Sequence, residues 1–523
     1  MRRRALLTAV GSLAAVGTAG GAVSGRVAAR SQGDAFGPTG TLAIPGTQDT
    51  AVADDGETVF VATGDGFAVA DVSDLASPEL LAERRSIRAD HEDGPLSGIW
   101  DVECSGSNVL VAGPAGPSQT DLQGAALFDV STPDDPELVS FYEADHGVHN
   151  VALDGTTAYL TGSGRHDEPV VVVEMDDGGE AKKVTDWSPV DAADRLSMLD
   201  SNLRNCHDLT VDGERLYASY WETGTWVLDV SDPATPSTIA RIGGRPLEEL
   251  RNLPRSETRR ALLNPPGNAH NAALNDDGLL AVSHEAFGEG VEGMGGVTLW
   301  DVSDLESGLV EGEEAVPTLD TARRRAILAP SAPDAESGKT LTTAHNCAFR
   351  GDRLYTSWYL DGVRAYDVAD PASPGLLAGW ADPSEANFFD AVPVAGGFVA
   401  PNLGVAEERG EPPQNAGLYT FTDPPADADT SPAATRTPVA VDASVTTTAP
   451  TTEETPATST SVSTQAGTDT PRPSTAAATS NTTATTATDG TTGGSGPGFG
   501  AFTALAGGAL ATWRLLGGER SEE

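Results

Sequence analysis

Residues 344–380 read AHNCAFRGDRLYTSWYLDGVRAYDVADPASPGLLAGW. Apolar and aromatic runs in this stretch alternate with turn signals at Gly351-Asp352, Asp361-Gly362 and Asp370–Pro374. The pattern predicts four short antiparallel strands, over residues 345–350, 353–359, 363–369 and 375–380. A single meander of this kind cannot bury both of its faces, so several copies must pack against one another.

The chain repeats this unit seven times, each copy opening its first strand with a two-residue motif. The motif occurs as Gln48-Asp49, Trp100-Asp101, His149-Asn150, His207-Asp208, His270-Asn271, His345-Asn346 and Phe389-Asp390. In five units the third strand closes with Asp-Val-Ser or Asp-Val-Ala, beginning at Asp71, Asp129, Asp229, Asp301 and Asp367. A period of roughly 45–75 residues suits four-stranded propeller blades better than a solenoid. We therefore expect an all-β fold, a seven-bladed β-propeller over residues 36–423.

The two ends of this region predict how the ring closes. The seventh unit stops after its third strand, at Leu418–Phe421, and lacks an outer strand. An orphan strand, Gly40–Pro45, precedes the first opening motif. We expect this N-terminal strand to complete blade seven, because closure leaves only short, protected strand edges.

Composition excludes one class of partner. The 32 basic and 77 acidic residues give a formal net charge of −45, and only three of the basic residues are lysines. Nucleic acid is therefore not an expected partner, because binding phosphates requires a basic surface. An acidic, lysine-poor composition resembles haloarchaeal proteins, whose charge repulsion is screened in strong salt. The alternative is an ordinary acidic surface protein.

The N-terminal segment, residues 1–29, has the form of an export signal. Three arginines follow Met1, and the apolar run Ala5–Ala19 comes next. This run is too short to span a bilayer securely. The paired arginines resemble a twin-arginine (Tat) signal, which exports proteins already folded.

The C-terminal 100 residues of the chain are predicted to be a stalk and an anchor. Residues 424–495 are rich in Thr, Ser, Ala and Pro, which predicts a disordered or O-glycosylated stalk. Residues 496–523 contain Pro497-Gly498-Phe499, an apolar stretch over 501–516 and Arg514. They can form a short membrane helix, and their order also resembles the PGF-CTERM sorting signal of haloarchaeal surface proteins. That resemblance implies removal of the helix by an archaeosortase and attachment of a lipid. Both interpretations predict an extracellular protein held at the membrane surface.

Long insertions concentrate on one predicted face of the propeller. In a propeller, the loops that join the fourth strand of one blade to the first strand of the next lie on one face. The loops that join the second and third strands within a blade lie on the same face. The longest insertions belong to these two classes, over residues 84–98, 115–124, 176–205, 243–268, 286–296, 305–344 and 404–416. Loops on a rigid scaffold commonly form binding surfaces, so we expect this face to bind a ligand or a partner. Arg245–Leu263 within it predicts a charged helix interrupted at Pro254.

Four histidines predict a metal site at the mouth of the channel on that face. His149, His207, His270 and His345 share one register in four consecutive blades. Converging imidazoles suit copper or zinc, one ion per chain. Three residues at the ends of second strands are expected to be further metal ligands or to orient the imidazoles: Glu222, His284 and Glu285. His146 and His166 are also candidate ligands, although they lie outside the repeated register.

The same motif also has a structural interpretation. An Asp or Asn follows in all seven units, which is typical of side chains that bond to backbone and stabilise a fold. We therefore assign these seven residues mostly to structure and keep the histidines, present in only four units, as candidate ligands. Cys104, Cys206 and Cys347 do not form an even set, so buried thiols are expected, with a soft-metal role open for Cys206 and Cys347. The sequence contains no Gly-rich phosphate loop, nucleophile elbow, His-Glu-X-X-His or Cys-X-X-Cys.

Two resemblances to known families follow from these motifs. The units at residues 207–241 and 345–380 combine His-Asx, Leu-Tyr and Trp/Tyr-Asp-Val, and they resemble LVIVD-repeat proteins, which are secreted or surface propellers. A more distant resemblance is to the selenium-binding protein and methanethiol oxidase family of seven-bladed propellers. It implies a metal centre at His149, His207, His270 and His345. Two functions remain open, a surface propeller that binds a ligand or partner and an extracellular metal-dependent oxidoreductase.

Overall fold

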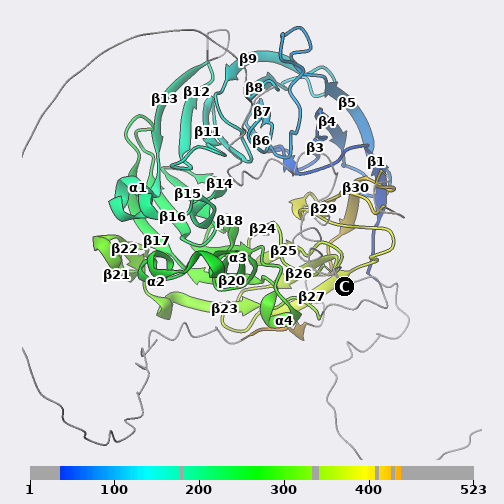
Figure 1. Ribbon diagram of the computed structural model, residues 1–523. Coiled ribbons are helices and arrows are strands. Elements are labelled where there is room, and N and C mark those ends of the chain that lie inside the picture. Colours follow the sequence, from blue (N-terminus) through cyan, green and yellow to red (C-terminus); the bar gives the residue numbers. More distant parts are fainter. Residues whose placement is uncertain are drawn as a thin grey trace, which may run out of the picture. The chain divides into compact units, whose positions relative to one another are not determined.

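The computed structural model describes residues 36–118, 121–176, 181–332, 341–406, 412–425 and 430–436. Within these ranges the strands form seven sheets arranged as the blades of a ring, and the four principal strands of each blade are antiparallel (Figure 1). The predicted seven-bladed β-propeller is confirmed.

Each blade has four principal strands, and the first of them lies nearest the channel. Blade one comprises β2 (Thr50–Val52), β3 (Thr58–Ala62), β4 (Gly66–Asp71) and β5 (Glu79–Arg85); blade two, β6 (Val102–Ser105), β7 (Asn108–Gly113), β8 (Gly124–Asp129) and β9 (Glu137–Glu143). Blade three comprises β10 (Val151–Asp154), β11 (Thr157–Thr161), β12 (Val170–Glu174) and β13 (Lys182–Trp187); blade four, β14 (Cys206–Asp212), β15 (Arg215–Tyr220), β16 (Gly224–Asp229) and β17 (Ser237–Ile242). Blade five comprises β18 (Ala269–Leu274), β19 (Leu279–His284), β20 (Val297–Asp301) and β23 (Arg324–Leu328); blade six, β24 (Cys347–Arg350), β25 (Arg353–Ser357), β26 (Val363–Asp367) and β27 (Gly375–Trp380). Blade seven comprises β28 (Val392–Val394), β29 (Gly397–Asn402), β30 (Gly417–Thr422) and β1 (Gly40–Ala43).

The hydrophobic core lies between blades. The middle strands are buried on both faces, as in β3, where all five residues are buried. Outer strands alternate or are largely exposed, as in β9, because one of their edges meets solvent. Phe67 of blade one meets Phe128 of blade two edge-on, with ring centroids 4.9 Å apart. Each blade therefore depends on its neighbours for burial, which explains why the unit is repeated.

The predicted closure of the ring is confirmed. β1 pairs antiparallel with β30, from Gly40 opposite Thr420 to Ala43 opposite Gly417. Ile44, directly after β1, is buried in a cluster that also contains Leu418. The first strand of the described chain thus completes the last blade.

Two expected loops contain strands, and this corrects the sequence analysis. β13 lies inside the segment 176–205 and β23 lies inside 305–344, and each is the outer strand of its blade. Residues 305–323 consequently join the third and fourth strands of blade five, on the face opposite the other long loops. They form β21 (Leu309–Glu311) and β22 (Pro317–Leu319), and β22 pairs with β17 of blade four. The insertions are therefore less one-sided than expected.

The propeller also extends further than residue 423. β31 (Ser431–Pro432), which the sequence assigns to the stalk, pairs with β27 at the outer edge of blade six. Arg436 donates from Nη1 to the Met294 carbonyl at 2.7 Å. The remaining stalk, the export signal and the sorting segment lie outside the described residues. Among the residues that are described, no helix has the length and apolar character needed to cross a membrane.

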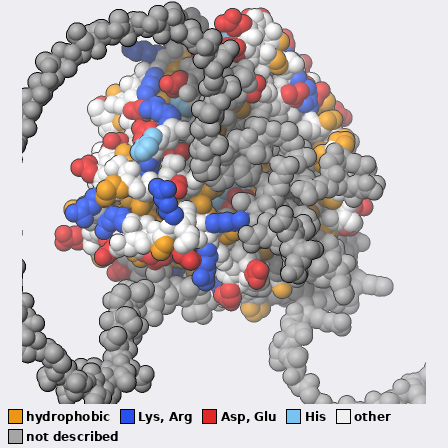
Figure 2. All heavy atoms as spheres, in the orientation of Figure 1, with side chains coloured by type: hydrophobic (Ala, Val, Ile, Leu, Met, Phe, Trp, Pro, Cys, Tyr) orange, Lys and Arg blue, Asp and Glu red, His pale blue; other side chains and the backbone are white. Residues whose placement is uncertain are grey.

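Helical segments cover the face that carries the connections into first strands and between second and third strands, which we call the loop face. They are α1 (Pro189–Ala192), α2 (Leu247–Asn252), α3 (Arg255–Leu263) and α4 (Gly290–Gly293), with the 3₁₀ turns η1 (Asp194–Met198) and η2 (Ser201–Arg204) (Figure 1). Three further turns, η3 (Glu306–Gly308), η4 (Glu313–Ala315) and η5 (Thr321–Arg323), belong to the blade-five insertion. The predicted break at Pro254 is confirmed, since this residue separates α2 from α3. Where described residues are visible in Figure 2, acidic and basic side chains are interspersed.

Deleting residues 36–45 tests ring closure. The deletion removes β1, exposes the edge of β30 and uncovers apolar surface beside Leu418, so the thermal midpoint should fall by roughly 5 °C or more. Circular dichroism on chains with and without these residues measures the change. A shortened chain with an unaltered midpoint would contradict the role of β1 in stability.

Candidate metal centre

Irregular strand pairing at the start of β14 and β18 directs His207 and His270 into the channel. In a regular strand, consecutive side chains point to opposite faces. The pairing of β14 shifts between Cys206 and Asp208, and that of β18 shifts between Ala269 and Ala272. Such bulges re-aim side chains. His207 and His270 therefore lie in the channel, as do the Asp208 and Asn271 side chains that follow them.

The four predicted histidines converge into one row. Ring centroids lie 4.3 Å apart for His149 and His207, 4.2 Å for His207 and His270, and 4.1 Å for His270 and His345. Aromatic residues of the same register extend the row, with Trp100 5.4 Å from His149 and Phe389 3.7 Å from His345. Six of the seven opening motifs thus contribute a ring to the mouth of the channel.

Three donor groups lie close enough to share one metal ion. Ligand atoms of His207, His270 and Glu285 are all within 4.8 Å of one another. His270 Nδ1 lies 3.6 Å from Glu285 Oε2, which is too long for a good hydrogen bond. Two tetrahedral zinc ligands at about 2.05 Å from the ion lie roughly 3.3 Å apart, so the observed spacing needs little adjustment. The Nδ1 atoms of His207 and His270 are buried and have no hydrogen-bond partner.

The two outer imidazoles are oriented by backbone carbonyls. His149 Nδ1 lies 3.1 Å from the Ala115 oxygen, and His345 Nδ1 lies 2.6 Å from the Phe389 oxygen. A carbonyl can only accept, so each Nδ1 carries the proton and each Nε2 keeps its lone pair. A hydrogen bond of this kind to one ring nitrogen is typical of histidines that bind metal through the other.

Burial keeps the imidazoles neutral. It lowers the pKa of His149 to about 4 and lowers the pKa of His207, His270 and His345 well below the ordinary value. For His207 and His270, repulsion from a neighbouring imidazole is the next cause. Neutral imidazole is the form that coordinates metals, so the row presents ligands rather than cations at neutral pH.

Tyr359 is part of the site, although the sequence analysis did not identify it. Its hydroxyl donates to Glu285 Oε1, which leaves Oε2 directed at His270. Burial raises the pKa of Glu285 to about 7, and the hydrogen bond from Tyr359 opposes that rise. Tyr359 has a positive φ of 50°, which is uncommon for an aromatic residue. A signal was present, because Glu285 and Tyr359 each lie two residues after a serine of the second strand, Ser283 in blade five and Ser357 in blade six.

The structure brings one of the three expected further ligands to the imidazoles. That residue is Glu285. Glu222 instead accepts from Arg245 Nε at 2.5 Å in a buried ion pair. Both ring nitrogens of His284 have other partners, with Nδ1 3.0 Å from the Gly267 oxygen and Nε2 3.0 Å from Thr298 Oγ1. Glu222 and His284 therefore stabilise the loop face.

The remaining histidine and cysteine candidates lie elsewhere. His146 Nδ1 is 2.9 Å from the Gly147 oxygen, and His166 is exposed. Cys206 and Cys347 are buried free thiols, and burial raises the pKa of both, so they remain protonated. Among the described residues, neither belongs to the group of clustered metal-binding side chains.

The Asp residues of the opening motifs make the backbone bonds that were expected of them. Asp49, Asp101, Asp208 and Asp390 each accept from the amide of the following residue, at 2.7, 2.8, 2.6 and 2.6 Å respectively. Some also bond between blades, since Asp101 Oδ2 accepts from the Val151 amide at 2.7 Å. The channel therefore holds two adjacent layers, imidazoles on the loop-face side and Asx side chains next to them.

Three of the similar solved structures have low sequence identity to this chain. The β-propeller domain of Myceliophteria thermophila Cps50 (Swd1) is 10% identical, with 74% of this chain and 99% of that chain covered and a TM-score of 0.46. The computationally designed Ika8 protein is 10% identical, covering 72% and 96%, with a TM-score of 0.39. BamB from Moraxella catarrhalis is 11% identical, covering 72% and 83%, with a TM-score of 0.35. No curated protein matches the sequence.

Two segments match the LVIVD repeat. They are residues 47–83, which contain three strands of blade one and most of the fourth, and residues 204–242, which contain all four strands of blade four. The repeat therefore corresponds to one blade with its opening motif. The chain is thus a seven-bladed β-propeller in which two blades, one and four, match the LVIVD repeat.

Proposed function

We propose that this protein is an extracellular metal-binding propeller, with one transition-metal ion held at the loop-face end of the channel. The observation that carries this proposal is the group of His207, His270 and Glu285, whose ligand atoms lie within 4.8 Å of one another. His149 and His345 flank the group and supply two more imidazoles. Copper is the first choice and zinc the second, because imidazole sites favour Cu²⁺ thermodynamically.

The surroundings of the site fit a bound cation. The imidazoles are neutral, so the only formal charge among these ligands is the Glu285 carboxylate. Unpartnered buried nitrogens cost free energy, and a metal ion would satisfy both His207 Nδ1 and His270 Nδ1. Trp221 stacks on His207 with centroids 5.5 Å apart and limits access of water. A bound copper would supply redox chemistry, and a bound zinc would supply Lewis acidity.

A metal-dependent oxidoreductase is the second candidate. Tyr359 and Glu285 favour it, because a hydroxyl hydrogen-bonded to a carboxylate beside the metal ligands can pass a proton to or from a ligand. Binding without turnover remains the first candidate, since the same groups also serve a site that only holds a ligand.

Metal content tests the first proposal. Protein purified without tags or chelators should carry about one copper or zinc ion, measured by elemental analysis. Replacing His207 or His270 with Ala should weaken binding by more than about 100-fold, because losing a ligand costs more than the 10–100-fold typical of an outer partner. His166→Ala is the matched control and should keep its metal, since that side chain is exposed. Metal-free protein that also fails to bind added Cu²⁺ or Zn²⁺ would refute the proposal.

Tyr359→Phe tests the positioning of Glu285. The variant keeps the ring but loses the hydroxyl that holds Oε1, so metal affinity should fall by about 10- to 100-fold while the metal content at saturation stays the same. The measurement is competition against a chelator of known affinity. Tyr366→Phe in blade six serves as a control, and equal affinities for the two variants would show that Tyr359 does not position the carboxylate.

Location outside the cell is part of the same proposal. It rests on the export signal and on the Thr-rich and sorting segments of the sequence, which frame the propeller at both ends. Intact mass of protein extracted from membranes should show loss of the signal and of the chain beyond Pro497-Gly498-Phe499. Retention of residues 501–516 would favour a plain membrane helix, and an intact N-terminus would contradict cleavage of an export signal.

A further inference from the structure

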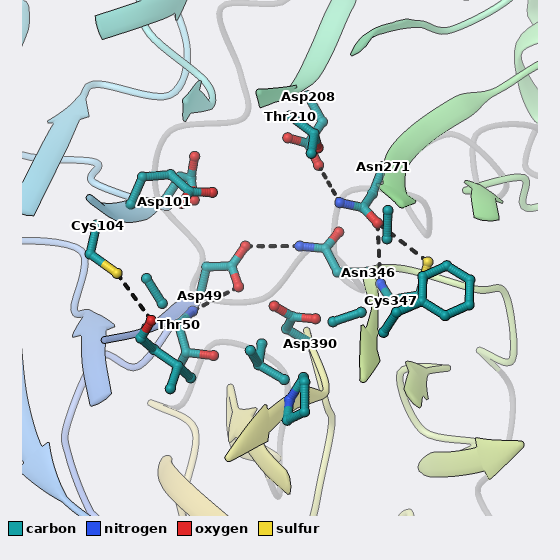
Figure 3. A pocket seen from close by; sticks show the side chains of 18 of the residues that line it. Asp49, Thr50, Asp101, Cys104, Asp208, Thr210, Asn271, Asn346, Cys347 and Asp390 are labelled. Atoms are coloured by element: carbon teal, nitrogen blue, oxygen red, sulfur yellow. Dashed lines mark hydrogen bonds between the residues drawn. The ribbon is translucent and has the colours of Figure 1, made fainter. Parts of the chain in front are cut away.

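A separate cavity lies next to the imidazoles, on the side away from the loop face. Its volume is about 480 Å³. The first strands of the blades line it, and it extends to Asp54 and Gly56 in the turn between β2 and β3. Figure 3 shows that Asp49, Asp101, Asp208, Asn271, Asn346 and Asp390 point toward one another from the surrounding blades. The cavity is therefore built by the Asx layer and is distinct from the histidine row.

The cavity lining is acidic, and no basic side chain among the described lining residues balances its charge. Six carboxyl groups line the cavity, from Asp49, Asp54, Asp101, Glu103, Asp208 and Asp390. Three amides join them, from Asn150, Asn271 and Asn346. None of the described residues lining the cavity is a lysine or an arginine. Buried carboxylates without cationic partners are costly, so a compensating cation or bound protons must be present.

The free-energy cost of burying carboxylates without a cation is clearest for Asp49 and Asp390. Their side chains are in hydrogen-bonding contact, which two ionised carboxylates cannot maintain. Burial, followed by the proximity of Asp390, raises the pKa of Asp49 well above its usual range. Burial also raises the pKa of Asp390, to about 7. Raised pKa values favour a proton between the two carboxyls, and a divalent ion can take the place of that proton.

An unpartnered oxygen gives independent support. Asn346 is 6% exposed and its Nδ2 donates to Asp49 Oδ2 at 2.9 Å. Its Oδ1 is buried and has no hydrogen-bond partner. Asn346 lines the cavity, and Figure 3 shows its amide reaching in from blade six beside Asp49 and Asp390. In the structure Nδ2 is the amide atom that contacts Asp49, so a cation would require a half-turn of the amide to bring Oδ1 beside this carboxyl. An amide oxygen together with two carboxylates is a ligand set that calcium prefers.

We propose that the cavity binds one hard divalent cation of the calcium type, with Asp49, Asp390 and Asn346 Oδ1 as protein ligands. Asp101 and Glu103 supply further negative charge and bind the ion directly or through water, for which the cavity has room. The chemistry separates this ion from the one proposed above, because oxygen ligands select hard cations and imidazoles select copper or zinc. The two sites would lie in successive layers of one channel.

Calcium-dependent stability tests this site. Thermal unfolding of the full-length chain is measured in EDTA and in millimolar CaCl₂, with KCl adjusted to constant ionic strength so that general screening of the −45 charge is unchanged. The midpoint should rise by several degrees with CaCl₂, and calorimetric titration should give about one high-affinity Ca²⁺ per chain. No rise with Ca²⁺, Mg²⁺ or Mn²⁺, or an equal rise with KCl alone, would overturn the proposal.

Substitution distinguishes this cavity from the acidic surface. Asp390→Asn should weaken Ca²⁺ binding at least about tenfold and abolish most of the rise in midpoint. In EDTA the same variant should be at least as stable as the parent, because one buried carboxyl has been removed. Asp134→Asn, on an exposed turn of blade two, is the matched control and should behave as the parent does. Ca²⁺ binding unaffected by Asp390→Asn would place the ion elsewhere and contradict the assignment.

The copper or zinc content of Asp390→Asn separates the two proposals. It should match that of the parent, since Asp390 is not among the ligands of the histidine site. A parent that binds Ca²⁺ but no copper or zinc would refute only the histidine site. A parent that binds copper or zinc without any Ca²⁺-dependent stabilisation would refute only the cavity site.

Discussion

Closure of the ring is the constraint on which every other feature depends. Seven blades can bury their faces only if each packs between two neighbours, and the pairing of β1 with β30 completes the last of these contacts. Closure also brings seven first strands to one axis. A residue type repeated in register is thereby concentrated within a few ångströms, as the imidazole centroids at 4.1–4.3 Å show. The site is a direct result of repetition in the sequence.

This relation explains what the sequence could and could not predict. The blade number, the closing strand and the convergence of His149, His207, His270 and His345 follow from register, which is visible in the residues. The choice between Glu222 and Glu285 depends on an offset of one residue, because Trp221, two residues after Ser219, occupies the position that Glu285 holds two residues after Ser283. The two glutamates also differ in their neighbours, Arg245 for Glu222 and Tyr359 for Glu285, and these come from other loops. β13 and β23 were missed because long connections hide outer strands from a repeat of fixed length.

The two layers of the channel show how one repeated dipeptide provides two environments. Bulges at the start of β14 and β18 direct both members of the motif inward, and adjacent residues therefore face the same axis at different depths. Nitrogen donors gather in one layer and oxygen donors in the next. The Asx side chains were assigned mostly to structure, and their bonds to backbone amides support that role. Those bonds use one oxygen of each carboxyl, and the second oxygen of Asp49 and of Asp208 accepts from an asparagine amide inside the channel.

The pairing of β1 with β30 also determines when the molecule can finish folding. Thr420 Oγ1 donates to the Gly40 carbonyl across 380 residues of chain, so the last blade must recruit a strand that the ribosome made first. Joining such distant segments adds little equilibrium cost, because loop-closure entropy grows only logarithmically with length. It does set an order of events, since non-local pairing comes late. The ring can close only after residue 422 has been synthesised. Folding of the propeller therefore cannot be completed blade by blade while the chain is still being made.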